Sequence, residues 1–225
     1  MSDLSNSEKS FAIFSCCKKS DIMKCAKLLN SGGVLVFPTD TVYGIGCDPF
    51  NSGAVERIYK IKVRSKDKPL PILAYSIEDV EKIVSLGKIG RLLAGIYWPG
   101  ALTIVTRVID MNLPHNVTAG GDCVGVRIPN NECLLSLLRQ CRYLIGTSVN
   151  ESGHHALISP AEILSSTLHG FDALLEGGPS MSAYESTVIK LSSDGVYIIR
   201  EGAIRSEEIY RLLNGTEPGE YKDDV

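Results

Sequence analysis

Short apolar runs that suit buried strands alternate along this chain with stretches whose apolar residues recur at helical spacing. A helix that Ser20 can cap precedes the run VLVF at 34–37, and a second helix, starting at Asn51 or Ser52, continues through Ile61. Such alternation predicts an α/β fold, in which helices cover a sheet. With 225 residues, 44% of them hydrophobic, the chain is long enough for one well-buried core.

The rest of the chain continues this pattern without repeats or low-complexity linkers. Further strands are predicted at 70–74, 101–107, 123–128, 143–148, 172–176, 186–191 and 196–200. Further helices are predicted after the capping box that starts at Ser76, near 132–141, from 159–160 and after Ser206. We interpret residues 1–19 as an N-terminal extension, 20–214 as one domain and the polar residues 215–225 as a disordered tail.

Charge and composition argue against several classes of protein. A net charge of −3 is unlike the basic excess of a general nucleic-acid coat protein, so any anion site must be local. No run approaches the roughly 18 apolar residues of a membrane span, and the N-terminus lacks the layout of a secretory signal. We therefore expect a cytoplasmic protein without a membrane partner. The seven cysteines are odd in number and include no CxxC pair, so we expect neither a disulfide framework nor a zinc site, and most cysteines reduced and packed as small hydrophobes.

Basic residues occupy every second position from Lys60 to Lys68, downstream of the polar residues Thr39, Asp40 and Thr41 that follow VLVF. If the basic segment is extended, its cations point to one side, because side chains alternate between the faces of a strand. Ligands of α/β proteins bind beyond the carboxyl ends of strands, so the two segments suggest a site for a polyanion such as a nucleoside triphosphate. The alternative is a solvated charged segment, which is the usual role of such a run.

A second polar cluster, GTSVN at 146–150, brings hydroxyl and amide groups to the end of another predicted strand. Its alternative role is a turn whose side chains bond their own backbone. Arg127 lies between apolar neighbours and, if buried, needs a carboxylate or phosphate partner. That partner is either a ligand or a structural acid such as Asp122 or Glu185, and Arg200 poses the same choice.

Other familiar site motifs do not occur in the sequence. The pair His154-His155 has no Cys, His or Asp set at ligand spacing beside it, so we expect no metal held by protein side chains. The sequence contains neither a GxxxxGK[ST] loop nor a GxGxxG loop. A bound nucleotide would therefore not lie on a glycine-rich phosphate loop.

Seven sequence blocks follow one another in an order typical of one family. They are PTDTVYGIG, KVRSKDKPL, WPGALTIV, VGVRIP, GTSVNESG, GGPSMSAYESTVIKL and IIREGAI. With these blocks the chain resembles the YrdC-like family, the L-threonylcarbamoyl-adenylate synthases of transfer-RNA modification, over roughly residues 20–210.

The resemblance implies a fold and an activity. The fold is a three-layer YrdC/RibB-like α/β domain, with a twisted mixed β-sheet flanked by helices and a deep basic cavity. The activity is that of a nucleotidyltransferase, which joins L-threonine, bicarbonate and ATP, with Mg²⁺ carried by ATP, into threonylcarbamoyl-AMP and releases pyrophosphate. A partner threonylcarbamoyltransferase then modifies adenosine 37 of transfer RNAs that read codons starting with A. Binding of transfer RNA or double-stranded RNA is a further expectation.

The resemblance also implies roles for individual residues. The motif lysine-x-arginine falls on Lys62 and Arg64, which would stabilise the phosphates during catalysis without a covalent nucleophile. The implied ATP-binding residues are Arg64, Lys68, Ser148, Asn150, Ser159 and Arg200. The implied L-threonine-binding residues are Thr41, Arg127 and Ser186.

The chain departs from the family pattern at several positions. Val63 and Ser65 replace a common glycine and proline, Leu73 stands where many members have a histidine, and the segment 151–158 is a few residues longer than usual. One alternative is therefore a non-catalytic or differently specific paralogue that binds RNA or nucleotide. Another, the related domain of hydrogenase maturation factors, is disfavoured because those chains are much longer.

Overall fold

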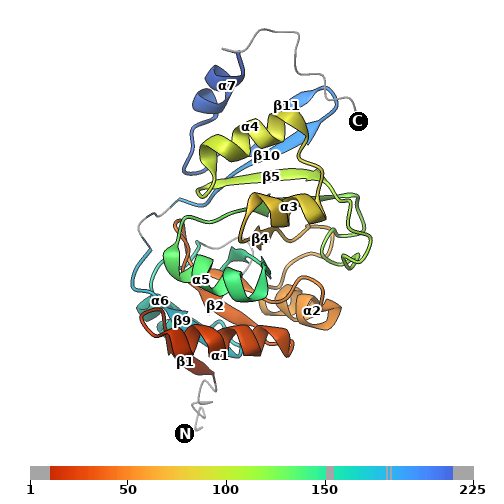
Figure 1. Ribbon diagram of the computed structural model, residues 1–225. Helices are drawn as coiled ribbons and strands as arrows, with labels where there is room; N and C mark the ends of the chain where they lie inside the picture. Colours follow the sequence, from red (N-terminus) through yellow and green to blue (C-terminus); the bar gives the residue numbers. More distant parts are fainter. Residues whose placement is uncertain (1–10, 151–154, 181, 183, 215–225) are drawn as a thin grey trace, which may run out of the picture.

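The computed structural model describes residues 11–150, 155–180, 182 and 184–214, and it divides their strands between two mixed sheets (Figure 1). The five-stranded sheet has the order β1-β9-β2-β3-β8, and the six-stranded sheet the order β11-β10-β5-β6-β4-β7. The first sheet contains β1 (Ala12–Ser15), β2 (Leu35–Phe37), β3 (Gly44–Gly46), β8 (Thr147–Ser148) and β9 (Ala173–Glu176). The second contains β4 (Ile72–Ala74), β5 (Leu102–Arg107), β6 (Cys123–Arg127), β7 (Tyr143–Ile145), β10 (Thr187–Ser192) and β11 (Gly195–Arg200). The predicted α/β fold is confirmed, with two sheets in place of one.

Helices cover both sheets, as the layers of Figure 1 show. They are α1 (Lys19–Asn30), α2 (Ser52–Ile61), α3 (Ile77–Ile83), α4 (Gly87–Tyr97), α5 (Glu132–Cys141), α6 (Pro160–Ser165) and α7 (Ser206–Asn214). The buried faces of α1 and α5 pack together with β2 and β9 in one apolar cluster. A larger apolar cluster contains the buried residues of α2, α3 and α4 and of the strands they cover. Within the described ranges, no helix combines the length and apolarity needed to cross a lipid bilayer.

Side-chain caps begin four of the predicted helices, and the sequence predicts capping side chains for two of them, α2 and α3. Asn51, Ser76, Asn131 and Ser159 each accept a hydrogen bond from the backbone N–H three residues later. The predicted cap at Ser20 is wrong, because α1 already begins at Lys19 and has no capping side chain. Helix α4 was not predicted, since it lacks a polar capping residue and carries glycines.

The predicted strand 143–148 is broken at Gly146, and its two halves belong to different sheets. β7 pairs with β4, whereas β8 pairs with β3. The backbone changes sheets here because the N–H of Gly146 bonds the carbonyl of Pro71 at 2.9 Å and the N–H of Ile145 bonds that of Cys47 at 2.8 Å. The two sheets therefore meet along residues 145–148.

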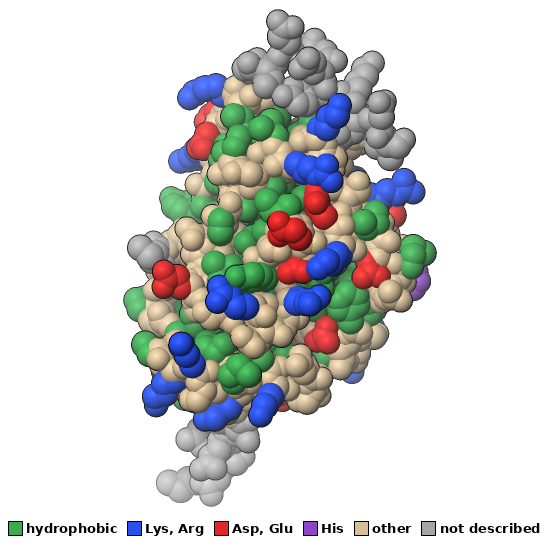
Figure 2. All heavy atoms as spheres, viewed as in Figure 1, with side chains coloured by type: hydrophobic (Ala, Val, Ile, Leu, Met, Phe, Trp, Pro, Cys, Tyr) green, Lys and Arg blue, Asp and Glu red, His purple; other side chains and the backbone are tan. Residues whose placement is uncertain are grey.

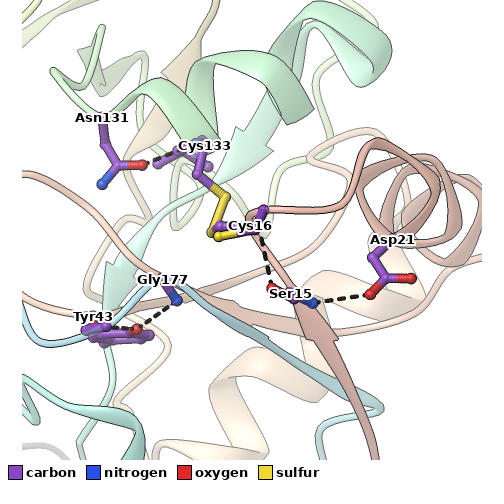
Figure 3. The surroundings of a disulfide bond; sticks show 10 residues. Ser15, Cys16, Asp21, Tyr43, Asn131, Cys133 and Gly177 are labelled. Atoms are coloured by element: carbon purple, nitrogen blue, oxygen red, sulfur yellow. Dashed lines mark hydrogen bonds between the residues drawn. A yellow bond between two sulfur atoms is a disulfide. The ribbon is translucent and has the colours of Figure 1, made fainter.

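A disulfide between Cys16 and Cys133 joins the end of β1 to the first turn of α5 (Figure 3). The sequence did not predict this bond, because the two residues are 117 positions apart. It lies beside Gly177, where a Cβ atom would stand 3.0 Å from the Cys16 sulfur. The other five cysteines are free, which agrees with the expectation that most are reduced.

Candidate functional site

A cavity of about 400 Å³ lies between the two sheets and collects most of the polar residues predicted from the sequence. The five-stranded sheet contributes Thr39 and Thr41 from the β2–β3 connection and Ser148 from β8. The six-stranded sheet contributes its own side chains, and these are Thr103, Arg127, Ser186 and Arg200. Arg64, which follows α2, completes this set.

Arg127, at the end of β6, is buried and bonded to three partners. Its Nε donates to the carbonyl of Gly100 at 2.8 Å, one terminal nitrogen donates to the Thr41 hydroxyl at 3.1 Å, and the other to the Asp40 carboxylate at 2.6 Å. Of the five guanidinium N–H groups, one on each terminal nitrogen has no hydrogen-bond partner within the part of the chain that the structure describes. Burial lowers the pKa of Arg127, and the Asp40 charge opposes this shift.

The acid that pairs with Arg127 is therefore Asp40, and neither Asp122 nor Glu185 fills this role. The direction of the hydroxyl protons follows from the same contacts. Thr39 donates to the Val42 carbonyl at 2.6 Å, so Thr41 must donate to the Thr39 oxygen at 2.9 Å. Thr41 thereby offers its remaining oxygen lone pairs to Arg127 and to the cavity.

Arg200, at the end of β11, approaches the start of β10. Its guanidinium pairs with Glu185 and donates to the carbonyl of Ser186 at 2.9 Å and to the Ser186 hydroxyl at 3.3 Å. The Ser186 hydroxyl also lies 2.9 Å from that of Thr103 on β5. Sequence reasoning offered Glu185 as a partner for either arginine and missed Thr103, which looks like an ordinary strand residue.

Lys62, the residue that caps the C-terminus of α2, is 1% exposed. Its ammonium donates to the carbonyl of Ser148, to the carbonyl of Asn150 at 2.9 Å and to the Asn150 side-chain oxygen at 2.8 Å. The Ser148 hydroxyl donates to the same Asn150 oxygen at 2.8 Å. Burial, assisted by repulsion from Arg64, lowers the pKa of Lys62 to about 8.

The basic segment does not form the predicted extended row of cations. Lys60 lies in α2, which continues through Ile61, and the residues after it form turns. Arg64 turns toward the cavity and donates to the carbonyls of Lys68 and Pro69 at 3.2 and 2.9 Å. Burial lowers its pKa. Because the segment is a helix end followed by turns, neighbouring cations point in different directions. The spacing of two residues predicts a single row only for an extended strand.

Three of the predicted ATP-binding residues do not line the cavity, and these are Lys68, Asn150 and Ser159. Lys68 is exposed, and its contribution is the carbonyl that receives Arg64. The Ser159 hydroxyl caps α6 by accepting from the N–H of Glu162 at 3.2 Å. His154 and residues 151–153 of the longer segment lie outside the described residues, as does the predicted tail.

Leu73 lies on the cavity wall at the position where the family pattern often has histidine. It is the register partner of Arg127, so the two side chains stand on the same face of the six-stranded sheet. A Cβ atom on Gly146 would come within 2.4 Å of Leu73. Gly146 therefore leaves the space that Leu73 fills.

The charges of the site are local. On the face drawn in Figure 2, Lys and Arg side chains are interspersed with Asp and Glu and form no continuous basic surface. Glu185 is the one carboxylate among the described residues that line the cavity, and it pairs with Arg200. Across the described ranges, no group of three or more His, Cys, Asp or Glu is placed to hold a metal ion.

These features define the class of protein: an α/β fold whose two mixed sheets line a cavity that contains three arginines, a site suited to an anionic ligand. Residues 27–202 match the model of the Sua5/YciO/YrdC family, whose description reads "Telomere recombination". The chain belongs to this family.

Individual relatives agree with this assignment. The threonylcarbamoyl-AMP synthase of Bacillus subtilis is 35% identical over 195 residues, which cover 85% of this chain and 56% of that protein. The threonylcarbamoyl-AMP synthase of Hydrogenovibrio crunogenus is 32% identical over 164 residues, which cover 70% of this chain and 85% of that protein. A structure of Pyrococcus abyssi Sua5 complexed with L-threonine is 30% identical, has a TM-score of 0.84, and covers 90% of this chain and 60% of that one. The chain thus spans little more than half the length of the Bacillus relative.

Proposed function

We propose that this protein is an L-threonylcarbamoyl-adenylate synthase, a nucleotidyltransferase that acts on ATP, L-threonine and bicarbonate. The family membership and the names of the relatives support this proposal. The observation that carries it is the meeting of Arg64, Arg127 and Arg200 in one cavity, because the reaction must hold a triphosphate and an amino-acid carboxylate side by side.

The amino acid would bind at the Arg127 end of the cavity. The two remaining N–H groups of Arg127, one on each terminal nitrogen, suit a carboxylate. Thr41, whose hydroxyl accepts from Arg127, would supply an oxygen beside it, and Ser186, which contacts Arg200, lines the same cavity. Asp40 fixes the plane of the guanidinium, so that little rotational freedom is lost when the substrate binds.

The nucleotide would bind toward Arg64 and Arg200, with Ser148 on the cavity wall and Asn150 behind it, bonded to the Ser148 hydroxyl. Arg64 and Arg200 are cations held by backbone carbonyls, which keeps their positive charge fixed while negative charge develops on the phosphates. Lys68 lies on the turn that receives Arg64, and a direct role for it in ATP binding would require this turn to rearrange. The same holds for Ser159, whose hydroxyl caps α6.

The chemistry then needs positioning and charge more than a nucleophilic side chain. The threonine nitrogen bonds to the carbon of bicarbonate with loss of water, which gives a carbamate. A carbamate oxygen attacks the α-phosphorus of ATP, and the bond to pyrophosphate breaks. Arg64 and Arg200 would stabilise the charge on the departing pyrophosphate, and the position of the cavity between the two sheets would limit access of water to the mixed anhydride.

Mg²⁺ would enter with the phosphates of ATP and neutralise part of their charge. The residues that line the cavity do not offer a set of ligands for a resident metal, since Glu185 is engaged by Arg200. We therefore treat the ion as part of the nucleotide substrate.

The test is substrate dependence. Purified protein is incubated with ATP, Mg²⁺ and bicarbonate, with L-threonine present, omitted or replaced by serine, and the nucleotide product is identified. The proposal expects pyrophosphate and threonylcarbamoyl-AMP only when threonine and bicarbonate are both present. A folded sample without turnover that binds structured RNA with a steep salt dependence would instead favour the non-catalytic paralogue.

The place of the product in a longer series of reactions follows from its chemistry. A carbamoyl-adenylate is an activated acyl donor, so a partner transferase must accept it, and we propose the enzyme that modifies adenosine 37 of transfer RNA. Addition of such a transferase and transfer RNA to the reaction should convert the adenylate into modified RNA with release of AMP.

A further inference from the structure

The lysine of the lysine-x-arginine pair is used differently from the arginine. The ammonium of Lys62 has three N–H groups, and the Ser148 carbonyl, the Asn150 carbonyl and the Asn150 side-chain oxygen accept from it. Lys62 is fully buried and does not line the cavity, whereas Arg64 does. With three acceptors already in place, the ammonium has no further N–H group for a phosphate oxygen.

These contacts connect two segments that lie far apart in the chain. Lys62 ends α2 and Arg64 follows it, while Ser148 ends β8. The end of β8 is also held by the N–H of Val149, which bonds the Tyr43 carbonyl at 2.9 Å, by the Val149 carbonyl, which accepts from the N–H of Leu157 at 3.0 Å, and by the short pairing with β3. A two-residue strand has few ladder bonds of its own, so the lysine is a major support of residues 148–150.

We propose that Lys62 is a positioning residue, which fixes the backbone and the amide side chain of residues 148–150 beside Arg64 and does not itself contact phosphate. Its effect on catalysis is exerted through Ser148, which lines the cavity, and through Asn150, whose side-chain oxygen accepts from the Ser148 hydroxyl. Removal of the ammonium takes away three hydrogen bonds to residues 148 and 150, while the Ser148 hydroxyl still donates to the Asn150 side-chain oxygen, and the strand end then opens more often. The part of this inference that concerns nucleotide rests on the proposed function, and the part that concerns the strand end does not.

The first test needs no ligand. Amide hydrogen exchange is measured in the wild type, Lys62→Met and the matched control Arg64→Met. We expect Lys62→Met to speed exchange of the Val149 amide roughly ten-fold or more, with β5 and β10 unchanged, and Arg64→Met to leave Val149 within about two-fold. Equal protection of Val149 in wild type and Lys62→Met would overturn the proposal. Uniform acceleration across both sheets would also overturn it, because Lys62 would then support the fold as a whole.

The second test separates positioning from phosphate contact. Dissociation constants for ATP and for adenosine, which has no phosphate, are compared in the same variants. A positioning role weakens both ligands by a similar factor in Lys62→Met, whereas Arg64→Met weakens ATP roughly ten-fold or more and adenosine little. Weakened ATP with unchanged adenosine in Lys62→Met would mean a direct phosphate contact and would overturn the proposal. A wild type that binds neither ligand would refute the proposed function, and the exchange comparison would still decide the role of Lys62.

Discussion

Lys62 is a buried ammonium whose pKa is lowered to about 8, mainly by burial, from the ordinary lysine value of 10.5. The unfolded chain therefore holds this proton more tightly than the folded protein between about pH 8 and 10.5. In that window, this group makes the free energy of unfolding rise with pH. Wild type and Lys62→Met are compared by urea unfolding at pH 7 and pH 10. We predict that, from pH 7 to pH 10, the free energy of unfolding of the wild type rises by roughly 1–3 kcal/mol relative to that of the variant. The same pH dependence of unfolding in both proteins would contradict this.

The ion pair of Arg127 and Asp40 is largely buried, with side chains 7% and 15% exposed. Arg127→Met leaves the Asp40 carboxylate without its partner, so we predict a loss of about 3–5 kcal/mol in the free energy of unfolding. Replacement of both residues, with Asp40→Asn added, should recover at least about 1 kcal/mol of that loss. The exposed pair of Arg205 and Glu201 is the control, and Arg205→Met should change stability by less than about 1 kcal/mol. If the changes in the free energy of unfolding caused by the Arg127 and Asp40 substitutions simply add, the two residues are not coupled.

At this scale the sequence predicted residue types better than residue partners. It indicated that Arg127 is buried and needs an acid, but the acid lies 87 positions away and is brought there by the approach of the two sheets. The prediction of an extended row of cations around Lys62 failed for a similar reason. A helix that continues through Ile61 rotates each following side chain, and periodicity alone does not reveal where the helix ends.

Gly46 on β3 marks the contact between the two sheets. A Cβ atom there would lie 1.6 Å from the carbonyl oxygen of Ile145, and backbone cannot move aside as a flexible side chain can. We predict that Gly46→Ala lowers the free energy of unfolding by about 3 kcal/mol or more. A Cβ atom on Gly95 in α4 would have nothing within 4 Å of it, so Gly95→Ala should be neutral or stabilise by roughly 0.5–1 kcal/mol. Chemical unfolding of both variants measures these changes in stability. Equal changes in the two variants would contradict the close contact between Gly46 and the Ile145 carbonyl.

The disulfide joins β1 to α5 across 117 positions of the chain. Closing so long a loop restricts the unfolded chain, so we predict that Cys16→Ser lowers the free energy of unfolding by about 2–5 kcal/mol. The exposed cysteine next to it offers a matched control, and Cys17→Ser should change stability by less than about 0.5 kcal/mol. Reductant should destabilise the wild type to the level of Cys16→Ser. No effect of reductant would show that the bond is not formed in solution. Disulfides are uncommon in reducing compartments, and the expected cytoplasmic location does not explain this one.

Most elements were predictable where local chemistry is strong. The starts of α2 and α3 follow from capping side chains, and the start of α6 from Ser159 and the proline after it, which act within a few residues. Helix α4 has no such cap and was missed. The change of sheet at Gly146 was also missed, because an apolar run gives no sign of which strands it will pair with.

For the molecule as a whole, the site is a product of the two-sheet arrangement. Each sheet contributes only part of the cavity wall, and the side chains that meet there come from segments between residues 37 and 200. The order of the sequence blocks allowed a resemblance to name six of these residues before their positions were known, and they are Thr41, Arg64, Arg127, Ser148, Ser186 and Arg200. It did not reveal that Lys62 turns away from the cavity or that Asp40 holds Arg127, because both depend on distances between distant segments.

The central claim is that one cavity holds a triphosphate at Arg64 and an amino acid at Arg127. The most direct measurement is threonine-dependent pyrophosphate release by wild type, Arg64→Ala and Arg127→Lys, with ATP and L-threonine varied in turn and folding checked by circular dichroism. We predict that Arg64→Ala abolishes release, and that Arg127→Lys raises the KM for threonine roughly 10- to 100-fold with little change for ATP. Full threonine-dependent activity in folded Arg64→Ala, or an unchanged threonine KM in Arg127→Lys, would contradict this account.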